Sequence, residues 1–100
     1  MKTAMIPAGP PRPPLFGLGR IFVSPGSFRS LPAREIGRAL TRHAAGDWGD
    51  LKPLDRVAND LALEKGSPVL SSFTARNGKR FRIITTASRS ETRVELREEE

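Results

Sequence analysis

Apolar and polar residues follow different spacings along this chain, and the spacings predict its elements. Residues 15–23 form an apolar run, LFGLGRIFV, that ends in β-branched and aromatic residues and is stopped by Ser24, Pro25 and Gly26. Such a run is typical of a β-strand. The later segments VLSSFTA at 69–75, RFRIITTA at 80–87 and TRVEL at 92–96 are β-prone as well. We therefore expect one strand early in the chain and three late.

Two segments between these strands have the spacing of amphipathic helices. The first is predicted to run from an N-cap at Ser30 to about Ala44, because Pro32 suits a first helical turn and Gly46 a C-terminal cap. The second is predicted from Pro53 to about Lys65, with Gly66 at its end. The stripes expected to face the core are Ile36, Leu40 and His43 or Ala44 in the first helix, and Leu54, Val57, Ala58, Leu61 and Ala62 in the second.

The doublet Asn77-Gly78 between two β-prone runs predicts a hairpin with a two-residue turn. Such a turn pairs Thr74 with Phe81 and places Phe73 and Arg82 together on the other face of the sheet. The last three strands then form an antiparallel meander. The expected fold class is α+β with the order β-α-α-β-β-β, in which two helices pack on one face of a mostly antiparallel sheet.

The predicted domain spans residues 15–97 and has an expected tail on each side. Residues 1–14 contain five prolines and few large apolar side chains, so we expect a disordered N-terminal tail. Residues 98–100 are all glutamate and form an acidic end. No apolar run approaches the roughly 20 residues that a membrane-spanning helix needs, and a cytoplasmic location is expected.

Composition narrows the chemistry that this chain can carry. It has no cysteine and one histidine, which excludes a disulfide framework and a thiolate zinc site, and we expect neither a metal nor a cofactor. The formal net charge is +6, and residues 67–94 hold six basic side chains against Glu91 alone. A local excess of positive charge favours an anionic partner such as nucleic acid.

Two basic surfaces are candidates for such a partner. On the predicted sheet face, arginines could engage phosphates while Phe73 stacks on a base, although a solvated face with Arg82 stacked on Phe73 is the alternative. On the first helix, a second stripe could follow a phosphate backbone or be its ordinary solvent side. The candidate nucleic-acid-binding residues are Phe73, Arg80, Arg82 and Arg93 on the sheet, and Arg34, Arg38 and Arg42 on the helix.

The segment HAAGDWGD at 43–50 holds the other candidate residues. His43 and Asp47 could act as a general acid and base with Arg42 nearby, but a histidine at a helix end is more often structural. Trp48 between two glycines is interpreted as an anchor for the inter-helix loop, with a partner-binding hot spot as the alternative.

The segment HAAGDWGD, then Asp55, Asn59 and Gly66, and then IITTASRSETRVEL at 83–96 resemble a family of small proteins borne on plasmids and integrative elements. Its members are often labelled as a type I restriction methylase subunit. The resemblance covers about residues 15–97 and includes Arg89 among its matching positions. Trp48 and Arg89 are the candidate partner-binding residues. This chain departs from the family pattern at Ser88, where the family has aspartate, and at Phe73, where it has tyrosine.

The leading hypothesis is a non-catalytic accessory protein of a mobile genetic element that binds nucleic acid or a nucleoprotein complex. Antagonism of host restriction or CRISPR defence would suit that setting. The element order is also similar to that of bacterial messenger-RNA-cleaving toxins, so a ribonuclease-like toxin with His43 and Asp47 as proton-transfer groups is one alternative. A protein–protein interaction module is the other.

Overall fold

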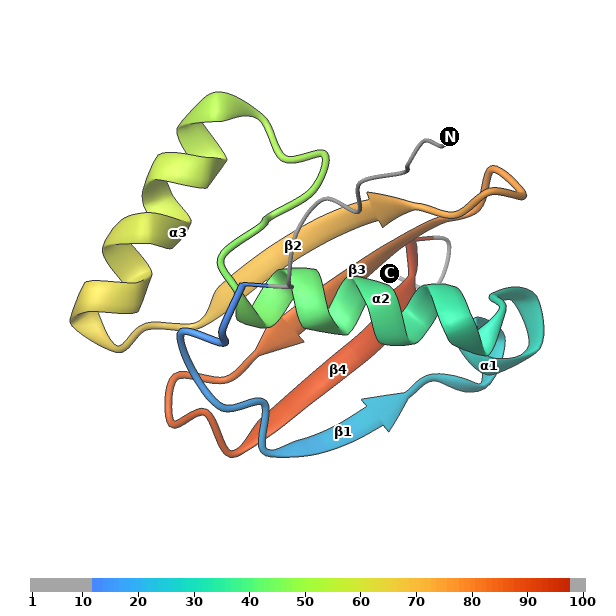
Figure 1. Ribbon diagram of the computed structural model, residues 1–100, viewed down its shortest axis with the longest axis horizontal. Helices are drawn as coiled ribbons and strands as arrows, with labels where there is room; N and C mark the ends of the chain where they lie inside the picture. The colour runs from blue at the N-terminus through green and yellow to red at the C-terminus, as the bar shows by residue number, and fades with distance from the viewer. Residues whose placement is uncertain (1–11, 98–100) are drawn as a thin grey trace, which may run out of the picture.

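A four-stranded sheet with helices on one side forms the computed structural model, which describes residues 12–97 (Figure 1). The strands lie in the order β1-β4-β3-β2; β1 runs parallel to β4 and the other neighbours are antiparallel. The protein is therefore α+β with a mostly antiparallel sheet. The elements are β1 (Arg20–Val23), α1 (Pro25–Ser30), α2 (Ala33–Ala44), α3 (Pro53–Lys65), β2 (Val69–Thr74), β3 (Arg80–Thr85) and β4 (Glu91–Leu96).

The expected tails fall mainly outside the part of the chain that the structure describes. Of the predicted N-terminal tail, only residues 12–14 are described, and all three are exposed. The acidic end at 98–100 lies outside the described residues.

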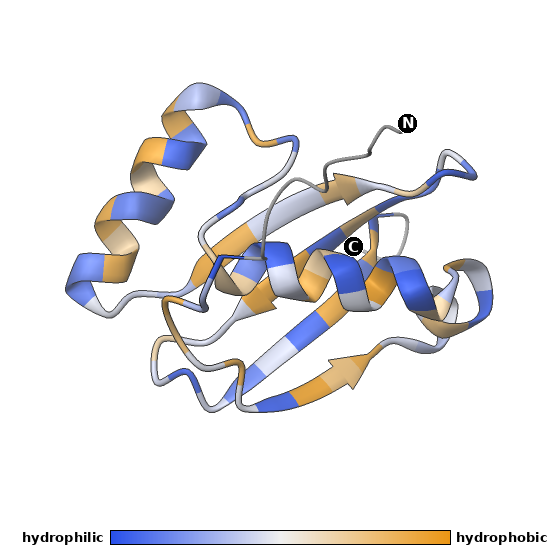
Figure 2. Cartoon of the chain, viewed as in Figure 1, coloured by the Kyte–Doolittle hydropathy of each residue, from blue (hydrophilic) through white to orange (hydrophobic). Residues whose placement is uncertain are grey.

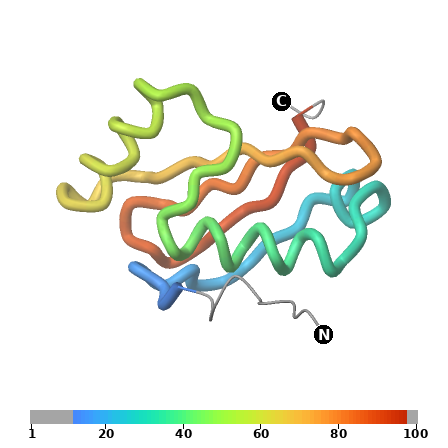
Figure 3. The backbone as a smooth tube through the Cα atoms, turned by 45° about the horizontal axis from the view of Figure 1, so that its top comes forward, coloured from blue at the N-terminus to red at the C-terminus, as the bar shows by residue number. Residues whose placement is uncertain are grey.

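The hydrophobic core lies between α2 and the sheet. Alternate residues of β3 and β4, among them Ile83 and Val94, are fully buried, as the two-residue period of a strand requires. From the helical side, Ile36 and Ala39 of α2 pack into the same cluster. In Figures 1 and 3 α2 lies across one face of the sheet. The cluster consists of Leu31, Ile36, Ala39, Phe73, Ala75, Phe81, Ile83, Val94 and Leu96.

The first strand is shorter than the run of apolar residues that predicted it. β1 begins at Arg20, so the prediction of a strand from residue 15 is wrong. Gly19 has φ +64°, and a Cβ there would lie 2.3 Å from the carbonyl of Ser90. Only glycine fits this close approach, which lets Arg20 N–H donate to Ser90 O at 2.9 Å. Residues 15–19 instead pass over the end of α2, where Leu15 N–H donates to Ala44 O.

A short helix that the sequence reading missed, α1, follows β1. Ser24 is its N-cap and accepts from Ser27 N–H at 3.1 Å, and Pro25 occupies the first turn. The prediction of Ser30 as the N-cap of the next helix is wrong, because Ser30 ends α1 and α2 begins after Pro32 without a side-chain cap.

The β2–β3 hairpin is one residue longer in its loop than predicted. Ala75 N–H donates to Lys79 O and Gly78 N–H to Ala75 O, with φ +87° at Gly78. This is a three-residue loop with a glycine bulge, so Phe73 pairs with Phe81 and Thr74 with Arg80. A register shift of one residue turns every side chain of β2 to the opposite face relative to β3. Phe73 therefore lies in the core, 4% exposed, and its predicted place on the open face is wrong.

Helix α3 has the predicted bounds, but the side predicted to face the core faces solvent. Pro53 begins it, and Gly66 ends it in the left-handed conformation at φ +73°. Yet Leu54, Val57 and Leu61 are 83%, 55% and 48% exposed, whereas the buried residue of α3 is Asn59 at 7%. Figure 2 shows apolar and polar residues interleaved along α3. The prediction that the apolar stripe of this helix faces the core is therefore wrong.

Candidate nucleic-acid interface

A buried chain of polar groups holds the end of α2 to the sheet. His43 is fully buried, its Nδ1 2.6 Å from Ser71 Oγ and its Nε2 2.9 Å from Thr85 Oγ1. Thr85 Oγ1 lies 2.7 Å from Thr92 Oγ1, which donates to Leu18 O at 2.7 Å. The chain thus links α2, three strands and the segment before β1, and it satisfies polar groups that burial would otherwise make costly.

This environment makes His43 a structural residue. Burial, and next the nearby charge of Arg89, lower the pKa of His43 from 6.5 to about 4. Its neutral ring is engaged at both nitrogens. Asp47, the predicted catalytic partner, instead accepts from Arg42 Nε at 2.7 Å and from Gly49 N–H at 3.0 Å. These hydrogen bonds, the one from Arg42 first, lower the pKa of Asp47. The structure therefore does not bring His43 and Asp47 together as an acid–base pair.

Trp48 anchors the loop between α2 and α3. It is 4% exposed, its ring meets the edge of His43 at 5.7 Å between centroids, and Phe16 stacks on it at 6.4 Å. Its Nε1–H donates to Asp60 Oδ1 at 3.1 Å. Burial leaves Trp48 little surface for a partner, which supports the anchor interpretation over the hot spot. Arg89, at φ +61°, is likewise engaged within the chain, donating to Ser67 O at 2.7 Å.

The loop after α2 and Asn59 of α3 cover part of the free edge of β2. Ser72 N–H donates to Trp48 O and Ser72 O accepts from Asp50 N–H, so the loop pairs with the strand at this point. Two residues earlier in β2, Asn59 forms hydrogen bonds with both backbone groups of Leu70: its Nδ2 donates to the carbonyl, and its Oδ1 accepts from the N–H. A side-chain amide thus takes the place of a neighbouring strand. Gly49 permits this approach, since a Cβ there would lie 2.1 Å from Ser72 O.

The open face of the sheet alternates positive and negative charge. In register, Arg82 of β3 pairs with Glu95 and Arg20 of β1 pairs with Glu91. Arg93 is exposed and donates to Glu91 Oε2 at 2.8 Å. The aromatic ring in this row is Phe22, 42% exposed, with the guanidinium of Arg20 at 5.5 Å from its centroid. Such a face carries little net charge, and its predicted arginines are dispersed across it.

Positive charge gathers instead beyond Ser72, where β2 is no longer covered by the loop. A pocket of about 450 Å³ opens there. Four basic side chains from α2, the loop after it, β3 and the end of β4 line it, against one carboxylate, Asp50, which accepts from Thr74 Oγ1 at 2.9 Å. The basic residues are Arg42, Lys52, Arg80 and Arg97.

A smaller hollow, of about 180 Å³, continues this surface between α2 and the hairpin. Arg38 and Arg76 line it together with Arg42, which is common to both hollows. The carboxylate of Glu35 accepts from Arg76 N–H at 2.8 Å. Arg42 itself lies over the ring of Phe73, 4.7 Å from its centroid. We call this continuous surface the basic edge; it comprises Arg38, Arg42, Lys52, Arg76, Arg80 and Arg97.

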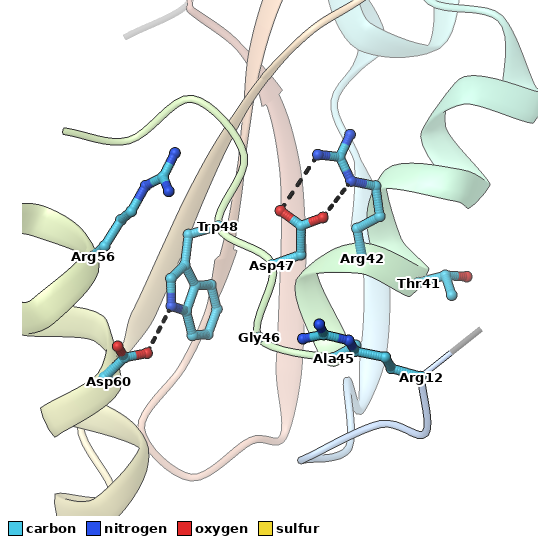
Figure 4. Close-up of a pocket in the computed structure, with 9 residues that line it drawn as sticks. All are labelled: Arg12, Thr41, Arg42, Ala45, Gly46, Asp47, Trp48, Arg56 and Asp60. Atoms are coloured by element: carbon cyan, nitrogen blue, oxygen red, sulfur yellow. Dashed lines mark hydrogen bonds and ion pairs between the residues drawn. The ribbon is translucent and has the colours of Figure 1, made fainter. Parts of the chain in front are cut away.

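A third pocket, of about 570 Å³, lies between the ends of α2 and α3 (Figure 4). In Figure 4 Arg42 points to Asp47 and Trp48 to Asp60, so both carboxylates are engaged within the chain. Arg56 donates to Gly49 O at 2.9 Å and to Leu51 O at 3.0 Å. The charged groups of this pocket stabilise the loop, and they offer a ligand less uncompensated charge than the basic edge does.

The structure thus brings together only part of each predicted surface. Arg80 from the sheet and Arg38 and Arg42 from the helix stripe meet at the basic edge, whereas Arg34 lies outside its two hollows. Arg93 lines a different hollow, near β1. The sequence reading missed Lys52, Arg76 and Arg97. Their positive charge was visible, but no local pattern shows that a loop, a turn and a strand end meet.

Comparisons with known proteins give no family for this chain, and searches of the described residues for metal-binding groups and membrane-spanning helices find none. No family model, curated protein or solved structure matches this chain. The resemblance to proteins of mobile elements therefore stays a prediction. Within residues 12–97 there is no group of three or more histidine, cysteine or acidic side chains placed to hold a metal. Among the described helices, none has the length and apolarity to span a membrane.

Proposed function

We propose that this chain is a non-catalytic accessory protein that binds the phosphate backbone of nucleic acid through the basic edge. The observation that supports the proposal is the pocket at the end of β2, where four basic side chains surround one carboxylate. Phosphate contacts by arginine and lysine supply most of the affinity of sequence-independent binding.

The charges of this pocket are available to a ligand. Lys52, Arg80 and Arg97 make no ion pair with any residue between 12 and 97. Asp50 is already engaged by Thr74, and Arg42 keeps part of its guanidinium N–H groups after bonding Asp47. Like charges held this close repel one another, so a bound phosphate relieves a cost that the free protein carries.

The number of basic side chains sets the number of contacts. The pocket at the end of β2 is lined by Arg42, Lys52, Arg80 and Arg97. If each of three or four of them meets about one phosphate, a single-stranded ligand shows a salt slope of about −2 to −3 on a logarithmic plot. Backbone contacts of this kind carry no sequence preference.

The setting of a mobile genetic element is the wider part of the proposal. It rests on the resemblance of the HAAGDWGD segment and its companions. In such a setting a small basic protein could bind nucleic acid or a nucleoprotein complex and so oppose host restriction or CRISPR defence.

Fluorescence anisotropy with a labelled 20-nucleotide single strand tests the proposal. We expect binding at low salt that weakens as salt rises, and a loss of roughly 30-fold or more in affinity for Arg80→Glu with Arg97→Glu. Parallel titrations with RNA and with duplex DNA identify the preferred form.

The matched control is Arg29→Glu with Arg34→Glu, which changes the net charge equally at exposed residues outside the basic edge. It should weaken binding less than about threefold, by the long-range field alone. Undetectable binding at low salt, or equal losses in the two double variants, would contradict the proposal.

A further inference from the structure

Arg42 is the basic residue that lines both hollows of the basic edge. Its guanidinium lies over the ring of Phe73, with Cζ 4.7 Å from the ring centroid. Two hydrogen bonds hold it there, from Nε to Asp47 Oδ2 at 2.7 Å and from Nη2 to Asp47 Oδ1 at 3.3 Å (Figure 4). An arginine side chain, which on a surface ordinarily samples many rotamers, is therefore fixed in one place.

The ring beneath Arg42 is also held in place. Phe73 is 4% exposed and packs on Phe81, with 5.8 Å between the ring centroids. The loop after α2 closes against the same ring, since a Cβ on Gly49 would lie 2.8 Å from Phe73 Cδ1. Asp47 belongs to that loop and accepts from Gly49 N–H. The guanidinium thus has a fixed support, and a ligand that contacts it immobilises little further side-chain freedom.

The positive charge of Arg42 is largely compensated. Its hydrogen bond to Asp47 is the main cause that lowers the pKa of this carboxyl, which therefore stays ionised at neutral pH. A phosphate gains less from Arg42 than from Lys52, Arg80 and Arg97, which make no ion pair within residues 12–97. What Arg42 offers is a planar, weakly hydrated group, 47% exposed, of the kind on which nucleobases stack.

We propose that Arg42 is a stacking platform for an unpaired base, and that the other three basic residues of the pocket hold the neighbouring phosphates. This role rests on the proposed function and narrows its ligand to single-stranded nucleic acid, because the bases of a duplex are already stacked on one another. The pocket of about 450 Å³ lies within the range of about 300 to 1,000 Å³ that small-molecule sites occupy. Asp50, the carboxylate that lines it, repels a phosphate but can accept from the N–H groups of a base.

Fluorescence anisotropy with two labelled strands of 20 residues tests the proposal. One is an oligothymidine, and the other has the same phosphates but abasic spacers in place of the inner nucleosides. The unchanged protein should bind the oligothymidine about tenfold more tightly, a comparison that needs no variant. Arg42→Lys keeps the charge but removes the planar group. It should weaken oligothymidine binding about tenfold, and binding of the abasic strand or of duplex DNA less than twofold.

The salt dependence separates a stacking contact from a phosphate contact. Arg42→Lys loses no phosphate contact, so the slope of the logarithmic plot should stay the same, whereas Arg80→Gln should reduce its magnitude by about 0.7. The matched control is Arg38→Lys, one turn earlier on α2 and exposed in the smaller hollow. It should weaken binding of either strand less than twofold.

The failure of the platform and the failure of the proposed function give different results. If the unchanged protein binds both strands equally, or if Arg42→Lys weakens both equally, Arg42 is no platform, although binding to phosphates stands. If the unchanged protein binds neither strand at low salt, the proposed function and the platform are both wrong.

Discussion

Helices α2 and α3 are nearly equal in length, with twelve and thirteen residues, but they are held to the sheet by different forces. Helix α2 buries Ile36 and Ala39 against the strands, in the way that an amphipathic surface helix usually does. Helix α3 turns its leucines to solvent and is held by Asn59, which bonds the backbone of Leu70, and by Asp60, which accepts from Trp48.

The difference shows what a hydrophobic stripe determines and what it leaves open. A stripe at helical spacing says which side of a helix is apolar. It does not say whether that side faces the core, because hydrogen bonds made by a polar residue on the opposite side can fix the orientation of the helix instead. Here the edge strand β2 has backbone groups without a neighbouring strand, and Asn59 forms hydrogen bonds with two of them.

Matched truncations in the two helices should give the largest contrast. Ile36→Ala leaves a cavity in the core and should lower the free energy of unfolding by about 3 kcal/mol. Leu61→Ala removes a side chain that is already half exposed and should change it by less than about 0.5 kcal/mol. Urea unfolding at a protein concentration of about 10 µM measures both. Equal losses would show that the stripe of α3 is buried within the monomer.

The attachment of α2 should also depend on pH, through His43. Its pKa is about 4 in the folded chain against an ordinary 6.5. The unfolded chain therefore takes up the proton first as the pH falls, and the fold should lose about 3 kcal/mol between pH 6.5 and pH 4, with full stability above that window. His43→Gln keeps amide groups for hydrogen bonding but cannot titrate, so its unfolding free energy should vary less over the same window. Identical pH profiles for the two proteins would exclude this role.

The attachment of α3 should depend mainly on one amide. Asn59→Ala removes both hydrogen bonds to Leu70 and should cost about 2 kcal/mol of unfolding free energy. It should also speed hydrogen exchange at Leu70, whose N–H donates to Asn59 Oδ1 at 3.1 Å. Glu64→Ala, exposed on the same helix, is the control and should leave both measurements unchanged. Unaltered exchange at Leu70 in Asn59→Ala would contradict this account.

Local signals in the sequence predicted elements better than they predicted pairings. Pro53 and Gly66 gave both ends of α3, because each residue type suits only one end of a helix. Asn77-Gly78 located the hairpin, but this doublet fits a two-residue turn and also a three-residue loop with a glycine bulge. The difference of one residue in loop length decides whether Phe73 faces solvent or packs on Phe81. Ser24-Pro25 was read as the end of a strand, although it begins α1.

The candidate site was harder to predict, because its residues come from distant parts of the chain. The two groups that bond His43 are 28 and 42 residues away, and no spacing rule links them. Arg42 and Arg80 were assigned to two competing surfaces, yet they line one pocket because β2 is an edge strand next to α2. Charge in the sequence located the basic residues, but only the tertiary fold shows which of them share a surface.

The parallel pairing of β1 with β4 has a consequence for how this protein is made. Arg20 pairs with Glu91, so β1 leaves the ribosome well before β4, the strand that it needs as its neighbour in the sheet. At 5–20 residues per second the wait is roughly 4 to 14 s. Meanwhile the hairpin of β2 and β3 can form locally, whereas Ile21 and Phe22 stay in an unpaired β-prone segment. Arg20 at the start of that segment supplies the kind of charge that guards such strands against association during synthesis.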